Sequence, residues 1–312
     1  MRRFLLHITL FCSLCCLFLA IPEWFYEYKA QHSEKAMYRV ANSIHGMKGQ
    51  NFDGIIIGNS RGGHYFVEVL DSASGHKWYN MSWSGHSFDY VYNILYKQYR
   101  LHNGKPKYII VDVGPWSFFE FFGDELTIEK LPLINYDGFE YLINRCPELT
   151  WKDRILLVRY AGREGKLITA ITQLVEKDPT NVPFKDVVFF PEGFPLEKNP
   201  RIIADFKKFI GECEAEGIKL VIVFSPMHSS KGQPQFDLDG MWGIVDGCVK
   251  GHDVPILRYG DMYGSDTSYF YDYVHMSRRG SRGFSKKLIH DMDSLGIIPI
   301  KHSLYEDTEN GK

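Results

Sequence analysis

The stretch Asp53-Gly54-Ile55-Ile56-Ile57-Gly58-Asn59-Ser60-Arg61-Gly62-Gly63 decides how the rest of the chain is interpreted. Three successive isoleucines, without alternating polar residues, are typical of a parallel strand buried on both faces. The strand breaks at Gly58, and residues 64–70 beyond the two glycines have the pattern of a helix. Because ligands bind at the carboxyl edge of such sheets, this turn presents Ser60 where a substrate would lie. The alternative is that Asn59 or Ser60 only caps the helix.

A second stretch, Asp272-Tyr273-Val274-His275, stands more than two hundred residues later and directly before the last predicted helix, 280–295. An Asp and a His three residues apart in a loop allow the carboxylate to hold one imidazole nitrogen while the other nitrogen faces outward. A general base that serves a serine needs this arrangement. The motif is common by itself, but its combination with a serine turn after the first strand indicates a nucleophile and its base.

The rest of the chain alternates between strand and helix patterns. Strands are expected at 77–82, 107–114, 218–224 and 255–258, and helices at 88–101, 201–216 and 236–249. This alternation predicts an α/β domain over 51–300 with a mainly parallel five-stranded sheet covered by helices on both faces. A helical insertion follows the third strand over about 116–198, with pieces at 126–131, 137–144 and 151–177 and a proline-rich loop at 179–200. Residues 301–312 form a polar tail.

The N-terminus carries an apolar run from Phe4 to Ile21 behind Met1-Arg2-Arg3. Eighteen residues are at the lower limit for crossing a bilayer, and the arginines favour an inside N-terminus with the rest of the chain outside. A cleavable signal peptide is the alternative, but a cut after Ala20 would put Phe18 where a small residue is needed. We therefore expect residues 1–21 to anchor the protein in the membrane, or to leave it secreted if cleaved, with 22–50 as a connector.

The composition bears on two classes of partner, nucleic acids and metal ions. A net charge of -2 over 312 residues gives no reason to expect nucleic acid. Three of the six cysteines lie in the apolar run, and Cys146, Cys213 and Cys248 do not have the spacing of metal ligands. No metal and no cofactor are expected.

With these residues placed, the chain resembles the SGNH (GDSL-like) hydrolase superfamily over about 53–114 and 201–292. This resemblance implies a flavodoxin-like three-layer sandwich with Gly58-Asn59-Ser60 at the serine block. It implies that Gly85 supplies an oxyanion N–H and that Asp272 and His275 form the last block. The membrane-tethered layout is similar to the cell-envelope branch, which includes the D-alanyl transfer protein of teichoic acids and the alginate O-acetylation proteins.

One block departs from the family pattern. The third strand runs into Gly114-Pro115-Trp116-Ser117, where the family has an asparagine whose amide stabilises the oxyanion. Loss of one such donor costs about 100- to 1,000-fold in rate. The run Gly58-Asn59-Ser60-Arg61-Gly62 also fits the Gly-x-Ser-x-Gly elbow of α/β-hydrolases, but there the acid and base lie on separate loops.

The resulting hypothesis is acyl transfer through a covalent acyl-enzyme. Ser60 attacks an ester carbonyl, His275 transfers the proton, and Asp272 fixes the imidazole tautomer. The backbone N–H groups of Ser60 or Arg61, together with that of Gly85, are expected to stabilise the oxyanion.

Further side chains are expected near the site. Four side chains are expected to contact the substrate: His64, His86, Trp83 and Trp116. The alternative for the two histidines is a solvent-facing or hydrogen-bonded role, and the alternative for the two tryptophans, which is the more frequent fate of such rings, is the aromatic core. The Arg61 side chain either binds an anionic group or supports the start of the helix.

Two function classes follow. The first is an exported envelope esterase or O-acyltransferase acting on an acylated glycan or another ester, with a membrane-bound acyl-donor protein as a candidate partner. The second is an inactive glycan-binding or assembly protein that keeps the fold.

Overall fold

A computed structural model describes residues 1–33, 35, 38–119, 128–135, 144, 146, 148–155, 159–175, 184–185, 198–229 and 237–301. The chain divides into two compact units. Unit 1 comprises Met1–Lys48 and Asp124–Asp178, and unit 2 comprises Gly49–Gly123 and Pro179–Lys312. Residues 137–143 of the predicted helix 137–144 and most of the predicted loop 179–200 lie outside the described residues.

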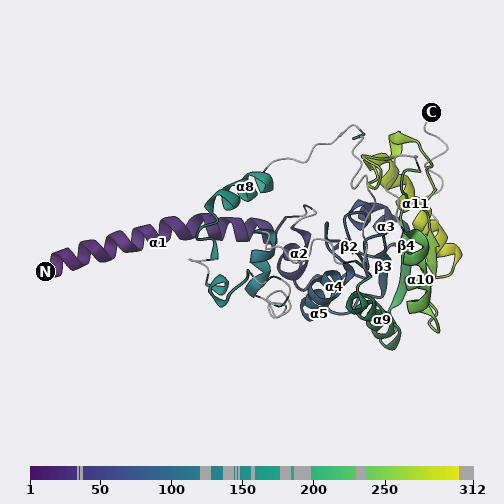
Figure 1. Cartoon of the computed structure of the whole chain (residues 1–312), viewed down its shortest axis with the longest axis horizontal. Helices are drawn as coiled ribbons and strands as arrows, with labels where there is room; N and C mark the ends of the chain where they lie inside the picture. The colour runs from purple at the N-terminus through teal and green to yellow at the C-terminus, as the bar shows by residue number, and fades with distance from the viewer. Residues whose placement is uncertain are drawn as a thin grey trace. The chain divides into compact units, whose positions relative to one another are not determined.

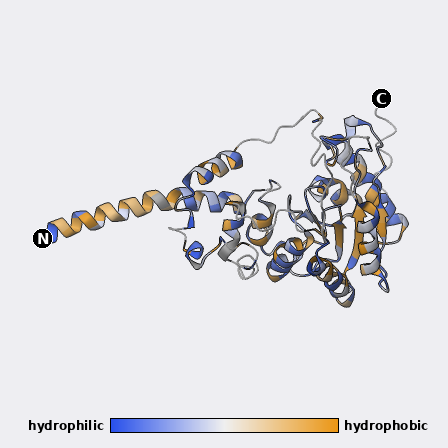
Figure 2. Ribbon diagram, in the orientation of Figure 1, coloured by the Kyte–Doolittle hydropathy of each residue, from blue (hydrophilic) through white to orange (hydrophobic). Residues whose placement is uncertain are grey.

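Unit 1 is built on one long helix, α1 (Arg2–Gln31), which Figure 1 shows at the N-terminus. The outer part of α1 is hydrophobic along its length (Figure 2). Within the described ranges, α1 is the one helix long and apolar enough to cross a bilayer; its 18-residue window has a mean hydropathy of 2.5 and is 0% buried. Its last turns pack inside unit 1, where Tyr26 and Ala30 are fully buried.

The other described elements of unit 1 are short. They are α2 (Arg39–Ala41), the π-helical η1 (Asn42–Gly46), the 3-10 helices η4 (Ile128–Asn135) and η5 (Trp151–Arg154), and α8 (Glu164–Val175). The predicted helix 151–177 is therefore a 3-10 turn followed by a separate α-helix. Gly162 lies between the two at φ +76, a left-handed conformation that a continuous helix does not contain and that favours glycine.

Unit 2 contains the predicted parallel sheet. Its strands are β1 (Gly54–Gly58), β2 (Trp78–Asn80), β3 (Tyr108–Asp112), β4 (Lys219–Phe224) and β5 (Ile256–Arg258). All neighbours are parallel, in the order β2-β1-β3-β4-β5. This is the flavodoxin-like strand order, in which ligands bind where the order reverses, at the carboxyl ends of β1 and β3.

Helices cover both faces of the sheet, as predicted. On one face, α3 (Val67–Ser74) and α11 (Arg278–Ser294) pack together over the core that includes Ile56, Ile110 and Val221. On the other lie residues 88–103 and α9 (Pro200–Ala215), which contacts α10 (Leu238–Val249). Residues 88–103 form one continuous run of three pieces, α4 (Phe88–Tyr90), the π-helical η3 (Val91–Tyr96) and α5 (Lys97–Asn103).

The segment after β1 differs from the prediction of a helix over 64–70. Residues Gly62–His64 form the 3-10 turn η2, and α3 begins only at Val67. The side chain of Tyr65, between the two, donates its hydroxyl to Asp112 at the end of β3 (3.2 Å). A tertiary contact therefore interrupts the local helical pattern.

Candidate active site

The loops after β1 and β5 meet at the carboxyl edge of the sheet. Ser60, two residues beyond β1, directs Oγ to within 2.8 Å of His275 Nε2. The other ring nitrogen, Nδ1, lies 2.9 Å from Asp272 Oδ2 and 3.1 Å from Oδ1. The three side chains that the sequence analysis singled out are thus joined in one hydrogen-bonded chain, although 215 residues separate the serine from the histidine.

The short loop that carries Asp272 and His275 fixes both side chains. Asp272 Oδ1 accepts hydrogen bonds from the backbone N–H groups of Val274 (2.9 Å) and His275 (2.8 Å). An isolated bridge between Phe270 and Met276 closes the base of the loop. The carboxylate is therefore held against the imidazole before any substrate arrives.

Electrostatics keep the Asp272 carboxylate ionised. Its partial burial acts to raise the pKa of Asp272, but the hydrogen bonds from the His275 ring and from two backbone N–H groups outweigh burial, so the pKa lies below its ordinary value. The negative charge holds a proton on the Nδ1 of His275 and leaves Nε2 as the acceptor for the Ser60 hydroxyl. With side-chain exposures of 22% for His275 and 13% for Asp272, the pair is reachable from solvent.

The loop after β2 approaches Ser60 from the neighbouring strand. The N–H of Trp83 donates to the carbonyl of Gly58, the last residue of β1 (2.8 Å). Gly85, two residues further, has φ +75, a left-handed conformation that favours glycine. A Cβ added to Gly85 would meet no atom within 4 Å, so this residue borders open space at the carboxyl edge.

Two predicted substrate-contacting residues belong to the core instead. The Trp83 ring is 1% exposed, because His86 stacks on it with ring centroids 3.7 Å apart and Tyr90 packs against its edge. His86 itself is 7% exposed, and its Nδ1 lies 2.8 Å from the carbonyl oxygen of Ser84. Neither ring offers a face to a sugar.

The other two predicted contact residues, His64 and Trp116, are partly exposed. The His64 ring lies 5.4 Å from that of His275 and 5.8 Å from that of Tyr271, measured between centroids. Trp116, in the loop after β3, is half-buried. The His64 ring is thus next to the ring of His275, whereas no contact joins Trp116 to the three residues of the hydrogen-bonded chain among the contacts of the described residues.

The structure contradicts the first interpretation of the Arg61 side chain, as a binder of an anionic group. The guanidinium is 1% exposed and lies over the Phe224 ring, so it is not available to an anionic substrate. The backbone N–H of Arg61 donates to Asn59 Oδ1 (3.1 Å), which leaves Ser60 and Gly85 as the better placed of the predicted oxyanion donors.

Two other arginines, Arg278 and Arg279, are exposed on α11. The Arg278 guanidinium lies over the ring of Phe66, and that of Arg279 lies over the ring of Tyr269.

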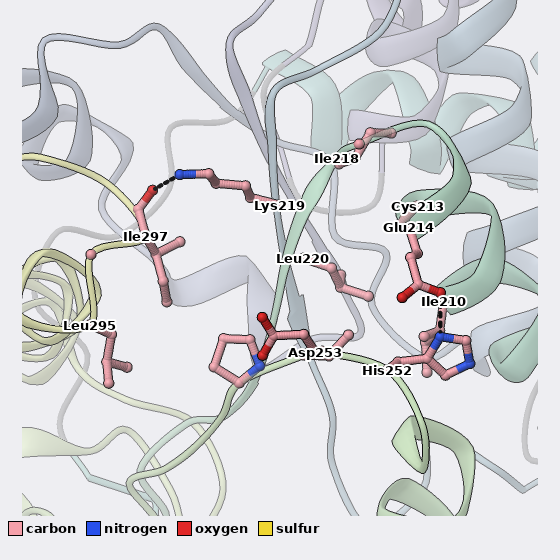
Figure 3. Close-up of a pocket in the computed structure, with 14 residues that line it drawn as sticks. Ile210, Cys213, Glu214, Ile218, Lys219, Leu220, His252, Asp253, Leu295 and Ile297 are labelled. Carbon is pink, nitrogen blue, oxygen red and sulfur yellow. Dashed lines mark hydrogen bonds and ion pairs between the residues drawn. The ribbon is translucent and has the colours of Figure 1, made fainter.

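A separate pocket of about 610 Å³ lies at the opposite edge of the sheet, at the amino ends of β4 and β5 (Figure 3). Its floor includes Ile218 and Leu220, and its rim carries the His252–Glu214 pair (2.7 Å) and Lys219, which donates to the carbonyl of Ile297 (3.1 Å). Because parallel strands all point the same way, this pocket and Ser60 lie at opposite ends of the strands.

No protein-family model matches the sequence, and the comparison with curated proteins gives no match. Among solved structures, the fold is similar to carbohydrate esterases. One is a family two carbohydrate esterase from Clostridium thermocellum in complex with cellohexaose (TM-score 0.37, 11% identity, covering 78% of this chain and 65% of that one). Another is an acetyl xylan esterase from the rumen bacterium Butyrivibrio proteoclasticus (TM-score 0.37, 10% identity, 78% and 64%). The chain thus spans about 65% of the length of the first of these structures.

Proposed function

We propose that this chain is an extracytoplasmic serine esterase or O-acyltransferase that acts on acylated glycans of the cell envelope. The observation that carries this proposal is the hydrogen-bonded chain from Ser60 through His275 to Asp272. A hydroxyl, an imidazole and a carboxylate in this order are the components of a nucleophile activated by a general base. The glycan substrate is the one that the sequence resemblance to the envelope branch implies.

The chemistry begins with attack of Ser60 Oγ on the carbonyl carbon of the ester. The Oγ–H proton passes to Nε2 of His275, which is 2.8 Å away, and Asp272 stabilises the resulting imidazolium. When the tetrahedral intermediate collapses, the C–O bond to the sugar breaks, and His275 returns the proton to the departing oxygen. The acyl group is then bound to Ser60 as an ester.

The second half-reaction decides between esterase and transferase. His275 removes a proton from the incoming hydroxyl, whose oxygen attacks the carbonyl carbon of the acyl-enzyme. The bond between that carbon and Ser60 Oγ then breaks, and His275 returns the proton to Oγ, which regenerates both residues. Water as the acceptor gives hydrolysis, and a sugar hydroxyl gives transfer. In the transferase case, a membrane-bound acyl-donor protein is the candidate partner.

The oxyanion in this scheme is stabilised by backbone donors. The N–H groups of Ser60 and Gly85 are proposed for this role, because Gly85 borders open space on the loop hydrogen-bonded to the end of β1. Backbone N–H groups can serve in this way without a side-chain amide. They would compensate for the asparagine that is missing after Asp112.

The labelling test follows from this mechanism. A fluorophosphonate probe should phosphonylate the purified full chain at Ser60, because the probe reacts with serines that an adjacent base activates. Tryptic peptide mass spectrometry would identify the modified residue. Ser72→Ala is the matched control, since Ser72 is an exposed serine on α3 whose hydroxyl donates only to helix carbonyls; this variant should be labelled as fast as the wild type.

Failure of labelling would favour the second candidate function, a glycan-binding or assembly protein without turnover. The observation that favours this candidate is the sequence Gly114-Pro115 at the end of β3, which offers no side-chain amide. Glycan binding by an unlabelled protein would establish it.

The proposed membrane attachment rests on α1. Removal of residues 2–21 should move the protein from the membrane pellet to the supernatant after an alkaline carbonate wash, because the exposed apolar side chains of α1 are lost. A variant with residues 4–21 in reverse order keeps the same composition and should stay in the pellet. A wild-type chain whose mass shows that it begins after Ala20 would show instead that the segment is a cleaved signal peptide.

A further inference from the structure

The turn that follows Ser60 is tied to the neighbouring strands at both of its ends. Residues Gly62–His64 form the 3-10 turn η2, and the Ser60 carbonyl accepts a hydrogen bond from Gly63 (3.2 Å). Arg61 and Tyr65 stand on either side of η2. Both side chains are buried, with exposures of 1% and 4%, so they point away from the solvent that reaches Ser60.

Tyr65 holds the far end of the turn. Its hydroxyl donates to Asp112 Oδ1 at the end of β3 (3.2 Å). Its ring packs edge-on against Phe284 of α11, with centroids 5.0 Å apart. The hydroxyl therefore connects the turn to the strand, and the ring connects it to the helix that follows His275.

Arg61 holds the near end. Its Nη2 donates to the carbonyl oxygen of Ser225, directly after β4, and its guanidinium carbon lies 4.3 Å from the centre of the Phe224 ring. The Nε and Nη1 atoms have no acceptor among the described residues. Burial of a charged group with unsatisfied donors costs free energy, which an apolar residue of the same volume would avoid.

Asp112 and Ser225 are hydrogen-bonded to each other and so connect the two ends of the turn. The backbone N–H and the hydroxyl of Ser225 both donate to the Asp112 carboxylate (3.2 Å each). Burial raises the pKa of Asp112, while the positive charge of Arg61 and the hydrogen bonds from Ser225 and Tyr65 act in the opposite direction. The Asp112 carboxylate is thus hydrogen-bonded directly to Tyr65 at the far end of the turn, and it is linked through Ser225 to Arg61 at the near end.

Two glycines, Gly58 and Gly62, allow the turn to pack closely against the neighbouring strands. A Cβ on Gly58 would lie 2.9 Å from the Asp112 carbonyl oxygen, and a Cβ on Gly62 would lie 2.5 Å from Ser82 Oγ. The turn therefore rests directly on the ends of the strands. A shift of η2 would have to break the hydrogen bonds that tie it to Asp112 and Ser225.

We define the turn clamp as the four residues Arg61, Tyr65, Asp112 and Ser225. We infer that the turn clamp positions the Ser60 hydroxyl against His275 and so sets the rate of acylation. This inference rests on the proposed function of Ser60. The clamp residues are positioning residues, because none of them touches the reacting atoms. Misplacement of a reacting group by 1 Å costs about 100-fold in rate, so a loosened turn should lower kcat and leave KM unchanged.

The decisive variant is Tyr65→Phe, which removes one hydroxyl from the clamp and keeps the ring. It should slow fluorophosphonate labelling of Ser60 and lower kcat for an activated ester by about 10- to 100-fold, with KM unchanged. Tyr259→Phe is the matched control. The Tyr259 ring also packs edge-on against Phe284 (5.2 Å), but its hydroxyl donates to Asp291 of α11 (2.7 Å) instead of Asp112. This variant should keep the wild-type kcat.

Ser225→Ala provides a second measurement, because it removes the hydroxyl bond to Asp112 and leaves the backbone bonds to Arg61 and Asp112. It should lower kcat in the same direction by a smaller factor. An unchanged kcat in Tyr65→Phe would overturn the clamp. It would also be overturned if Tyr65→Phe and Tyr259→Phe lost kcat equally and in proportion to the drop in their melting temperatures, because the loss would then reflect stability alone. A wild-type protein without labelling at Ser60 would instead overturn the proposed function itself.

Discussion

Substitution of Ser60 by alanine should lower the turnover of an activated ester by at least about 10⁴-fold, since the covalent route is lost. The same loss is expected for His275→Gln, because the glutamine cannot take the proton from Ser60 Oγ. Initial rates with a chromogenic acetate ester would measure both. The Ser72→Ala control should keep the wild-type rate and show that the loss is specific to Ser60.

The double variant of Ser60 and His275 gives the sharper result. Residues that act as one unit lose little more together than apart, so the double variant should be no slower than Ser60→Ala. If the two losses multiplied, the side chains would act independently, and the 2.8 Å contact between them would have no role in proton transfer. Thermal unfolding of each variant would show that the fold is retained.

Substitution of Asp272 by asparagine should lower kcat by about 10⁴-fold, because an amide can stabilise the wrong imidazole tautomer. The asparagine side chain can still accept the backbone N–H bonds of Val274 and His275, so the loop should keep its conformation. Steady-state kinetics with the same ester would measure the change. Asp266→Asn is the control: Asp266 caps the 3-10 helix η6 (Thr267–Tyr269) by accepting from Ser268, and its loss should leave kcat unchanged.

The same variant has a pH signature in stability. The pKa of Asp272 is lowered on folding, so the folded state binds this proton less tightly than the unfolded state does. The carboxylate therefore stabilises the fold above its ordinary pKa of about 3.9, and this contribution disappears as the pH falls through the lowered pKa. Denaturant titrations should show Asp272→Asn less stable than the wild type at pH 7, with a smaller difference at pH 3. A difference that is independent of pH would contradict this assignment.

The strands β1, β3 and β4 were predictable because they are short runs rich in β-branched residues. The bounds predicted at 107–114 and 218–224 enclose β3 and β4, and the parallel sheet follows from the alternation with helices. Two departures were not predicted. The helix after β1 starts late because Tyr65 is held by Asp112, and the predicted helix 151–177 is interrupted by the left-handed Gly162, which its hydrophobic pattern does not reveal.

The site was predictable where its residues are close together in the sequence or directly follow a recognisable strand. Asp272 and His275 are three residues apart, and Ser60 follows a strand whose end is marked by Gly58. The turn clamp was not predicted, because its bonds join residues up to 164 positions apart. A signal was present nevertheless: Asp112 ends a buried β-branched strand, where a carboxylate needs a polar partner. For Trp83 the structure shows the aromatic-core alternative, which the sequence could not decide because it does not reveal which aromatic ring another ring will cover.

The continuity of helix α1 bears on the orientation of unit 1 relative to a bilayer. It runs unbroken from Arg2 to Gln31, and its last turns are part of the core of unit 1, where Glu27 pairs with Arg159 and accepts a hydrogen bond from Tyr160. Residues 22–31 extend the helix by about 15 Å past the apolar run. In the anchored state proposed above, the spanning segment and the part that packs inside unit 1 are therefore one helix, with Pro22 at the junction between them. Lipid thickness, which governs the tilt of a spanning helix, would then also govern the orientation of that unit.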